Sequence, residues 1–220
     1  MVRDADTMLM TIVSNTTASN KRGARIALAL GLLLSLGGAL FVWQHYFSTY
    51  HLATVQEGVL YRDGARSAHE LEIAVRKTHA KTVVCLVDDQ EMSDPAKPQF
   101  QEEMNWLKQQ GIAAERIPVK LGGWPTTENV QRFLQTAGDR TKQPILVHCA
   151  QGVRRTAFMV AAYQESVLGY DRQRAKGAIM SFGHSDRTIN DIRRFIDEYD
   201  PSSRTVSTQL AHATLTGAEK

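Results

Sequence analysis

Residues 144–156 read PILVHCAQGVRRT and decide how the chain is expected to fold. The apolar start of this stretch predicts a buried strand, and residues 157–168 predict a helix. Between the two, Arg155 follows Cys149 by six positions, and Gly152 lies midway. A strand that leads through a short loop into a helix can bind an anion on the backbone N–H groups of the helix start. The stretch therefore predicts a phosphate-binding loop.

The side chains of this loop suit attack on a phosphate ester. A free thiol has a pKa of about 8.5 and only the thiolate is a good nucleophile, so the inward N–H groups and the helix dipole are expected to lower the pKa of Cys149. Gly152 permits a close backbone approach. The planar guanidinium of Arg155 can grip two phosphoryl oxygens, which a lysine cannot do. Thr156 is expected to donate its hydroxyl toward the sulfur and to help it leave.

Other residues of the loop have supporting roles. His148 ends the predicted strand and is expected to orient the loop. Arg154 has two open interpretations: it adds positive charge to the pocket, or it is simply solvated. The alternative for the whole stretch is a buried structural cysteine before a basic helix start, but Gly and Arg at these offsets favour the phosphate site. The predicted phosphate-binding residues are Ala150, Gln151, Gly152, Val153, Arg154 and Arg155.

A second informative segment lies near the N-terminus. Residues 26–43 contain no charged residue, and as a helix they would rise about 27 Å, close to the hydrocarbon thickness of a bilayer. Aromatic residues continue the run to Phe47, which is typical of a membrane interface. Basic residues precede the run and are absent just after it, which predicts a cytoplasmic N-terminus and an exported remainder. A single-pass anchor is favoured over a cleaved signal peptide or a buried core helix.

Composition limits the classes of protein and the domain organisations that remain possible. The 220 residues carry a net charge of +3, from 26 basic and 23 acidic residues, which does not indicate nucleic-acid binding. Two cysteines, Cys85 and Cys149, imply no disulfide framework. The expected organisation is a polar N-terminus (1–25), a transmembrane anchor (26–47), a linker (48–54), one catalytic domain (55–200) and a flexible tail (201–220).

Within the domain, predicted strands and helices alternate. This order predicts an α/β fold: a three-layer-like sandwich whose short, largely parallel central sheet is flanked by helices, preceded by one transmembrane helix. Cys85 lies within a predicted core strand, where packing is its expected role; a protective disulfide with Cys149 is the alternative. Strands are expected at 55–61 (or a hairpin), 82–87, 112–119 and 144–148, and helices at 67–78, 97–110, 126–137, 157–168, 171–181 and 188–199.

The signature His-Cys-x-x-Gly-x-x-Arg-Thr, the segment YRDGARSAHELE at 61–72 and the order of elements resemble the small dual-specificity protein phosphatases, most closely their membrane-anchored bacterial members. The resemblance covers about residues 55–199. It implies a metal-independent, cofactor-free, two-step reaction with Cys149 as nucleophile, Arg155 as phosphate clamp and the 150–155 backbone as cradle. It also implies a phosphorylated protein as substrate.

The chain departs from that family at the general acid. The family places an aspartate about thirty residues before the cysteine, whereas residues 117–126 read IPVKLGGWPT and contain no carboxylate. General acid catalysis is typically worth about 10²–10⁴-fold, and its loss matters least for leaving groups of low pKa. Phosphotyrosine or aryl phosphates are therefore favoured as substrates. The candidate replacement acids are Glu128, Asp186, Asp88 and Asp89.

Four functions compete at this point. The leading hypothesis is a membrane-tethered phosphomonoester hydrolase. A phosphate-binding pseudophosphatase is the non-enzymatic alternative, although such a protein would not need Cys149 and Arg155. A lipid phosphatase would need extra cations, for which only Arg154 and Lys120 are available. A rhodanese-like sulfurtransferase also uses a cysteine loop, but Arg155 and Thr156 at these offsets fit it poorly.

Overall fold

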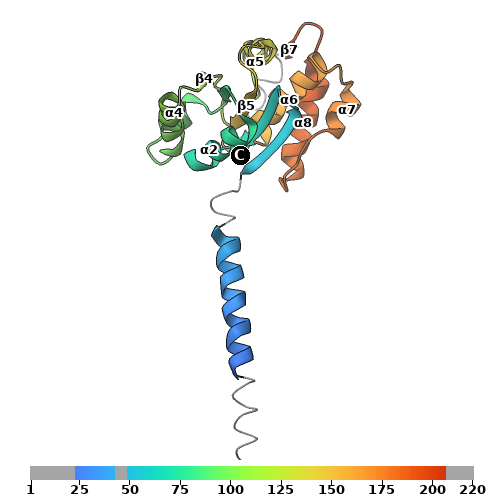
Figure 1. Ribbon diagram of the computed structural model, residues 1–220. Coiled ribbons are helices and arrows are strands. Elements are labelled where there is room, and N and C mark those ends of the chain that lie inside the picture. Colours follow the sequence, from blue (N-terminus) through green and yellow to red (C-terminus); the bar gives the residue numbers. More distant parts are fainter. Residues whose placement is uncertain (1–22, 43–48, 207–220) are drawn as a thin grey trace, which may run out of the picture. The chain divides into compact units, whose positions relative to one another are not determined.

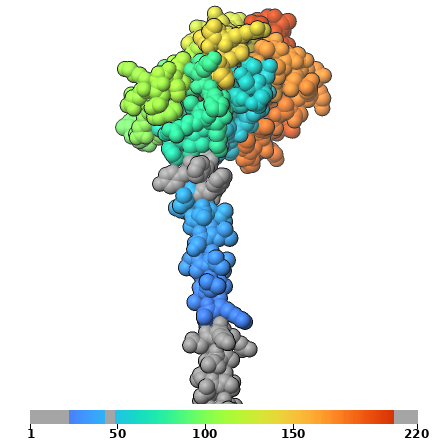
Figure 2. Space-filling view, viewed as in Figure 1, coloured from blue at the N-terminus to red at the C-terminus, as the bar shows by residue number. Residues whose placement is uncertain are grey.

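The computed structural model describes residues 23–42 and 49–206, and the chain divides into two compact units, Met1–Ser48 and Thr49–Lys220. In the first unit, Gly23–Val42 form one helix with a mean hydropathy of 2.1 (Figure 1). Its apolar side chains are exposed, Leu34 by 76%. Figure 2 shows this helix in blue. By length and composition this helix can span a membrane or act as a signal sequence. Residues 43–47 of the predicted anchor lie outside the described residues.

The second unit is built on a five-stranded sheet with β5 at its centre. The strand order is β1-β2-β5-β3-β4, and only the β1–β2 pair is antiparallel. Parallel strands end at the same edge of a sheet, so the carboxyl ends of β2, β3 and β5 lie together, where open α/β sheets bind ligands. The strands are β1 (Tyr50–Gln56), β2 (Leu60–Gly64), β3 (Thr82–Cys85), β4 (Ala113–Arg116) and β5 (Ile145–Cys149).

Helices cover both faces of the sheet, which confirms the predicted layered α/β architecture (Figure 1). Alternate strand residues point to opposite faces: Val84 and Val147 pack toward α5, α6 and α8, whereas Val83 and Leu146 pack toward α2 and α4. The longer helices are α2 (Ala68–Thr78), α4 (Gln99–Gln109), α5 (Thr127–Gly138), α6 (Arg154–Ser166) and α8 (Asp186–Glu198); α3 (Asp89–Met92) and α7 (Arg172–Gly177) are short.

Local signals in the sequence explain several helix ends. The side chain of Ser67 accepts the N–H of Glu70 and begins α2 as predicted. Thr126 and Asn129 form a capping box at the start of α5. Gly111 follows α4 with a φ of +68°, the left-handed conformation that glycine adopts most readily.

The boundaries of the domain differ from the prediction at both ends. The first strand begins at Tyr50, within the predicted linker, and forms a hairpin with β2. Residues 201–206, predicted to be part of a flexible tail, form a turn and the two-residue strand β7 (Thr205–Val206), which pairs with β6 (Tyr199–Asp200). The reason is the buried side chain of Val206 and its N–H, which donates to Thr127. The rest of the predicted tail, 207–220, lies outside the described residues.

Candidate active site

The predicted loop curls around the sulfur of Cys149 at the centre of the sheet edge. Cys149 is the last residue of β5, and α6 begins at Arg154. The N–H of Gly152 donates to Cys149 Sγ at 3.2 Å. Burial disfavours the thiolate, but the positive charge of Arg155 and the polar groups of Thr156 and the loop backbone together lower the pKa of Cys149. A lowered pKa favours the thiolate, the form of cysteine that acts as a nucleophile.

The end of β2 packs directly against this loop. Gly152 has a φ of +68°, and a Cβ atom there would lie 2.4 Å from the carbonyl oxygen of Asp63. Conversely, a Cβ at Gly64 would lie 2.6 Å from the backbone of Gln151. Real Cβ atoms do not approach backbone so closely, so both positions require glycine. The loop shape therefore depends on two glycines from different segments, of which the sequence analysis identified only Gly152.

Arg62 is a functional candidate that the sequence analysis missed. It is 2% exposed, and its Nη2 donates to the carbonyl oxygens of Gly152 at 2.6 Å and Val153 at 3.5 Å. Burial lowers its pKa to about 10, while the charge of Cys149 acts in the opposite direction. Arg62 is therefore still positively charged at neutral pH and holds the loop from outside. The signal in the sequence that could have identified Arg62 is a basic residue within a short, buried strand.

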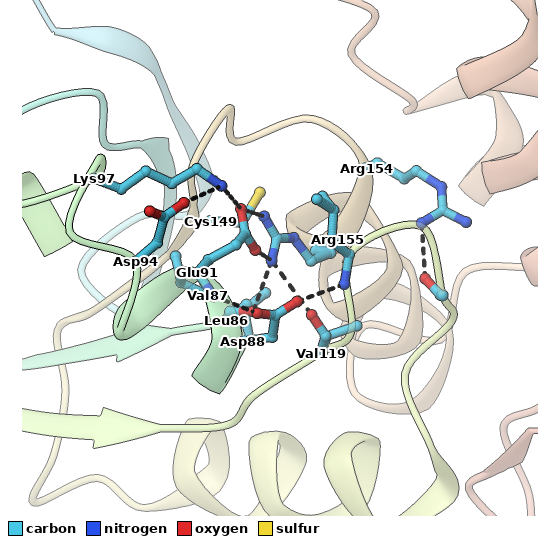
Figure 3. A network of polar contacts seen from close by, with 12 residues as sticks. Leu86, Val87, Asp88, Glu91, Asp94, Lys97, Val119, Cys149, Arg154 and Arg155 are labelled. Carbon is cyan, nitrogen blue, oxygen red and sulfur yellow. Dashed lines mark hydrogen bonds and ion pairs between the residues drawn. The ribbon is translucent and has the colours of Figure 1, made fainter.

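The guanidinium of Arg155 is held in place by Glu91, which the sequence analysis also missed. Arg155 Nη1 pairs with Glu91 Oε2, and Nη2 lies 3.3 Å from Oε1, a two-pronged ion pair. Both side chains are buried, and Lys97 Nζ lies 3.8 Å from the same carboxylate. Figure 3 shows Glu91 between Lys97 and Arg155, with the sulfur of Cys149 beside them. Glu91 lies in α3, so its role depends on a helix that the sequence pattern did not reveal.

The buried candidate acid, Asp88, has a structural role. It caps α3, and its two oxygens accept the N–H groups of Glu91 and Leu121, each at 2.7 Å. Although burial opposes ionisation, these hydrogen bonds lower the pKa of Asp88, with the charge of Arg155 assisting. A carboxyl with a lowered pKa is a poor proton donor at neutral pH.

The other three candidate acids lie on exposed surface. Asp89 pairs with Arg116 at 2.9 Å, and its side chain is 78% exposed. Glu128 and Asp186 lie in the first turns of α5 and α8, where negative charge stabilises a helix start. In the part of the chain that the structure describes, no hydrogen bond or ion pair joins any of these three side chains to the loop residues named above.

The contacts of Arg154 differ from both roles that the sequence left open for it. Its guanidinium donates to the carbonyl oxygens of Gly123 at 2.7 Å and Gly122 at 2.9 Å, and its Nε donates to Asp191 at 2.6 Å. Trp124 donates to the same carboxylate at 3.0 Å. Figure 3 shows the Arg154 side chain directed away from Cys149. Arg154 therefore fastens the segment at Gly122 and Gly123 to Asp191 of α8.

His148 belongs to a buried polar cluster beneath the loop. Strand register places Asp63 and Cys85 on either side of His148, and Glu103 of α4 lies 2.9 Å from His148 Nε2. Burial alone would lower the pKa of His148, but the carboxylate of Glu103 raises it well above its usual value. Cys85, Glu103 and His148 present ligand atoms within 4.8 Å of one another, a set that could in principle hold zinc. His148 and Glu103 already pair with each other at 2.9 Å, and the orienting role of His148 stays a prediction.

Cys85 packs on a different side of the sheet from Cys149. Its contacts are Val87, Met92 and Phe100, whereas Cys149 belongs to the core cluster on the α6 side. Both cysteines are free and buried. The packing role predicted for Cys85 agrees with these contacts.

Asp63 should make the free energy of unfolding depend on pH. Burial raises its pKa to about 8, so between about pH 4 and pH 8 the folded state holds a proton that the unfolded state has lost. The free energy of unfolding should therefore fall by about 1.4 kcal/mol per pH unit across this window because of this group. Asp63→Asn cannot ionise and should remove that slope. Urea unfolding of both proteins from pH 5 to 8 measures the difference, and parallel curves would contradict the prediction.

Comparison with known proteins agrees with this geometry. The family model described as "DSP-PTPase phosphatase fused to NAD+ Kinase" matches residues 46–196. "Probable NAD kinase 2, chloroplastic" from Oryza sativa subsp. japonica is 32% identical over 130 residues, which cover 58% of this chain and 13% of that protein. "Dual specificity protein phosphatase TpbA" from Pseudomonas aeruginosa is 24% identical over 127 residues, covering 58% of this chain and 52% of TpbA. The matched segment thus spans 13% of the length of the NAD kinase and about half of the length of TpbA.

Solved structures share the fold. The catalytic core of the PP-IP phosphatase Siw14 from S. cerevisiae superposes with a TM-score of 0.56 at 19% identity, covering 69% of this chain and 86% of that core. The crystal structure of P. aeruginosa TpbA gives a TM-score of 0.54 at 23% identity, covering 74% and 91%. At such identities the likeness concerns the fold alone.

Proposed function

Because this chain belongs to the DSP-PTPase family described as fused to NAD+ kinase, a group of cysteine-dependent dual-specificity phosphatases, we propose that it hydrolyses phosphomonoesters through a phosphocysteine on Cys149 while tethered to a membrane. The single observation that carries the chemistry is the sulfur of Cys149 lying among loop amides beside a fixed Arg155. A pseudophosphatase would need the cradle but not a thiol with a lowered pKa.

The proposed reaction has two displacements at phosphorus. The Cys149 thiolate attacks, the S–P bond forms and the P–O bond to the leaving group breaks, with the electron pair going to the leaving oxygen. Arg155 and the loop N–H groups stabilise the charge on the equatorial oxygens. Water then attacks phosphorus, the S–P bond breaks, and Thr156 assists the departing thiolate. Phosphate is released and water supplies the protons.

Substrate preference follows from the segment that Arg154 fastens. Residues 117–126 contain no carboxylate, so we expect a leaving group to depart as an anion or to take its proton from water. Phenolate leaves more readily than an alkoxide, which favours phosphotyrosine over phosphoserine in a phosphorylated protein partner. Among relatives, one TpbA structure is a complex with pTyr. Phosphoanhydrides are the second candidate, because their leaving phosphate is also a weak base and Siw14 is a PP-IP phosphatase.

Membrane attachment is proposed from the first unit. The helix Gly23–Val42 rises about 30 Å, enough to cross the hydrocarbon core. Basic residues before it favour a cytoplasmic N-terminus and a catalytic domain on the other side. A phosphoinositide or other lipid substrate is less favoured, because Arg154, one of the two candidate extra cations, is paired with Asp191.

A leaving-group series tests the proposed function. The detergent-solubilised full chain is assayed for phosphate release from aryl phosphates of increasing phenol pKa and from an alkyl phosphate, with excess EDTA present. We expect metal-independent release, inhibition by orthovanadate and a steep decline in rate as the leaving-group pKa rises. A flat dependence would show that a general acid operates, and phosphate binding without release would favour the pseudophosphatase.

A further inference from the structure

Side chains outside the catalytic loop bind the carbonyl oxygens of two neighbouring peptide units in it. Arg62 binds the carbonyl of Gly152 at 2.6 Å. The preceding carbonyl, that of Gln151, lies 2.7 Å from Nδ1 of His51. The peptide unit that begins with this Gln151 carbonyl ends with the N–H of Gly152, which donates to Cys149 Sγ at 3.2 Å. His51 and the sulfur therefore lie at opposite ends of one rigid, planar amide.

We infer that His51 is a positioning residue for the nucleophile: by donating its Nδ1–H to the Gln151 carbonyl, it keeps the Gly152 N–H directed at the sulfur of Cys149. A hydrogen bond accepted by a carbonyl also polarises the amide and strengthens its N–H as a donor. Both the neutral tautomer protonated at Nδ1 and the imidazolium can donate this bond, so the contact does not require a charged ring. The inference rests on the proposed role of Cys149 as nucleophile.

The surroundings of His51 hold its ring in the required plane. The ring stacks between Tyr50 and Phe182, with ring centroids 3.8 Å and 4.2 Å away, and the His184 ring, nearly perpendicular, has its centroid 5.9 Å away. Arg66 lies over Tyr50 at 3.8 Å. These rings come from the start of β1 and from the loop between α7 and α8, segments far apart in the sequence. A ring clamped on both faces can rotate little, which fixes the direction of its Nδ1–H.

The backbone at both segments is strained in a way that supports a positioning role. His51 has a φ of +66° and Phe182 a φ of +47°; histidine adopts this left-handed conformation more often than most residues, whereas for the bulky phenylalanine it is rare and costs free energy. Such conformations persist where surrounding contacts hold them, and they cluster at functional sites. Arg62 lies 5.3 Å from the Phe182 ring. The same arginine that binds the Gly152 carbonyl therefore also contacts the stack that holds His51.

The test separates the hydrogen bond from the ring stack. His51→Phe keeps an aromatic ring and removes the donor, whereas His51→Asn places an amide nitrogen near the position of Nδ1. His184→Phe is the matched control, since it alters a neighbouring ring of His51 and, among the described residues, the His184 side chain makes no hydrogen bond to the loop. The pKa of Cys149 is measured in the full chain from the pH dependence of its alkylation by iodoacetamide, followed by mass spectrometry of the Cys149 peptide.

We expect His51→Phe to raise the pKa of Cys149 by about 0.4 to 1, the equivalent of one net hydrogen bond. His51→Asn should restore most of the difference, and His184→Phe should leave the pKa near the wild-type value. An unchanged pKa in His51→Phe, or an equal rise in His184→Phe, would overturn the inference. If His51→Phe does not fold, His51→Leu is measured against His51→Asn under the same criteria. A raised pKa in a protein that releases no phosphate would refute the proposed function and leave the positioning role intact.

Discussion

Changing Cys149 to serine should abolish phosphate release from every aryl phosphate that the wild type hydrolyses. A serine hydroxyl ionises only far above neutral pH, so the loop amides and Arg155 cannot make it a nucleophile as they do the thiol. Loss of a covalent nucleophile costs an enzyme about 10⁴-fold or more. Steady-state assays with the purified full chain measure the effect.

The same variant should still bind phosphate, because the cradle consists of backbone N–H groups and Arg155. Phosphate binding by calorimetry checks that Cys149→Ser is folded. Cys85→Ser is the matched control: this second cysteine is buried on the other side of the sheet and should keep most of the activity. Substantial turnover by Cys149→Ser would mean that another group attacks phosphorus.

Arg155→Lys should lower kcat by about 10³-fold. Lysine keeps the positive charge but cannot hold two phosphoryl oxygens with one planar fork, and removal of preorganised transition-state donors typically costs about 10²–10³-fold or more. The exposed Arg132 of α5 supplies a control, since Arg132→Lys should leave kcat unchanged. A loss confined to KM would mean that Arg155 binds substrate and transition state equally.

Two substitutions of Glu91 test its part in holding Arg155. Glu91→Gln leaves one acceptor for the Arg155 fork, so its loss of kcat should be smaller than that of Arg155→Lys. Glu91→Ala leaves a buried guanidinium without its partner, which costs about 3–5 kcal/mol in stability by analogy with other broken buried pairs. If Glu91→Ala were as stable and active as the wild type, the ion pair would have no part in holding the clamp.

The parts of this site that sequence predicts are those whose residues are consecutive. Strand β5, the loop and α6 form one uninterrupted segment, so spacing alone predicts that Cys149 and Arg155 belong to the same loop. The cap at Ser67 is equally local, because its partner is three residues away. Likewise, the missing carboxylate at 117–126 was visible directly in the sequence.

The residues that sequence did not reveal act across long separations. Arg62 reaches the loop from β2, 90 residues earlier, and His51 reaches it from 100 residues earlier. Glu91 lies in a four-residue helix, too short to produce a helical pattern. Among three neighbouring carboxylates, only packing decides that Asp88 caps, Asp89 faces solvent and Glu91 holds Arg155.

The contact between Gly64 and Gly152 has a consequence for protein engineering. Each lacks a side chain because the other segment's main chain occupies that space. A chimera that imports a nucleophile segment from another enzyme into this scaffold would therefore inherit a steric mismatch unless the end of β2 were exchanged with it. The smallest unit that could be transplanted therefore consists of two separate segments, the end of β2 and the catalytic loop. The nine-residue signature by which such proteins are recognised is not enough by itself.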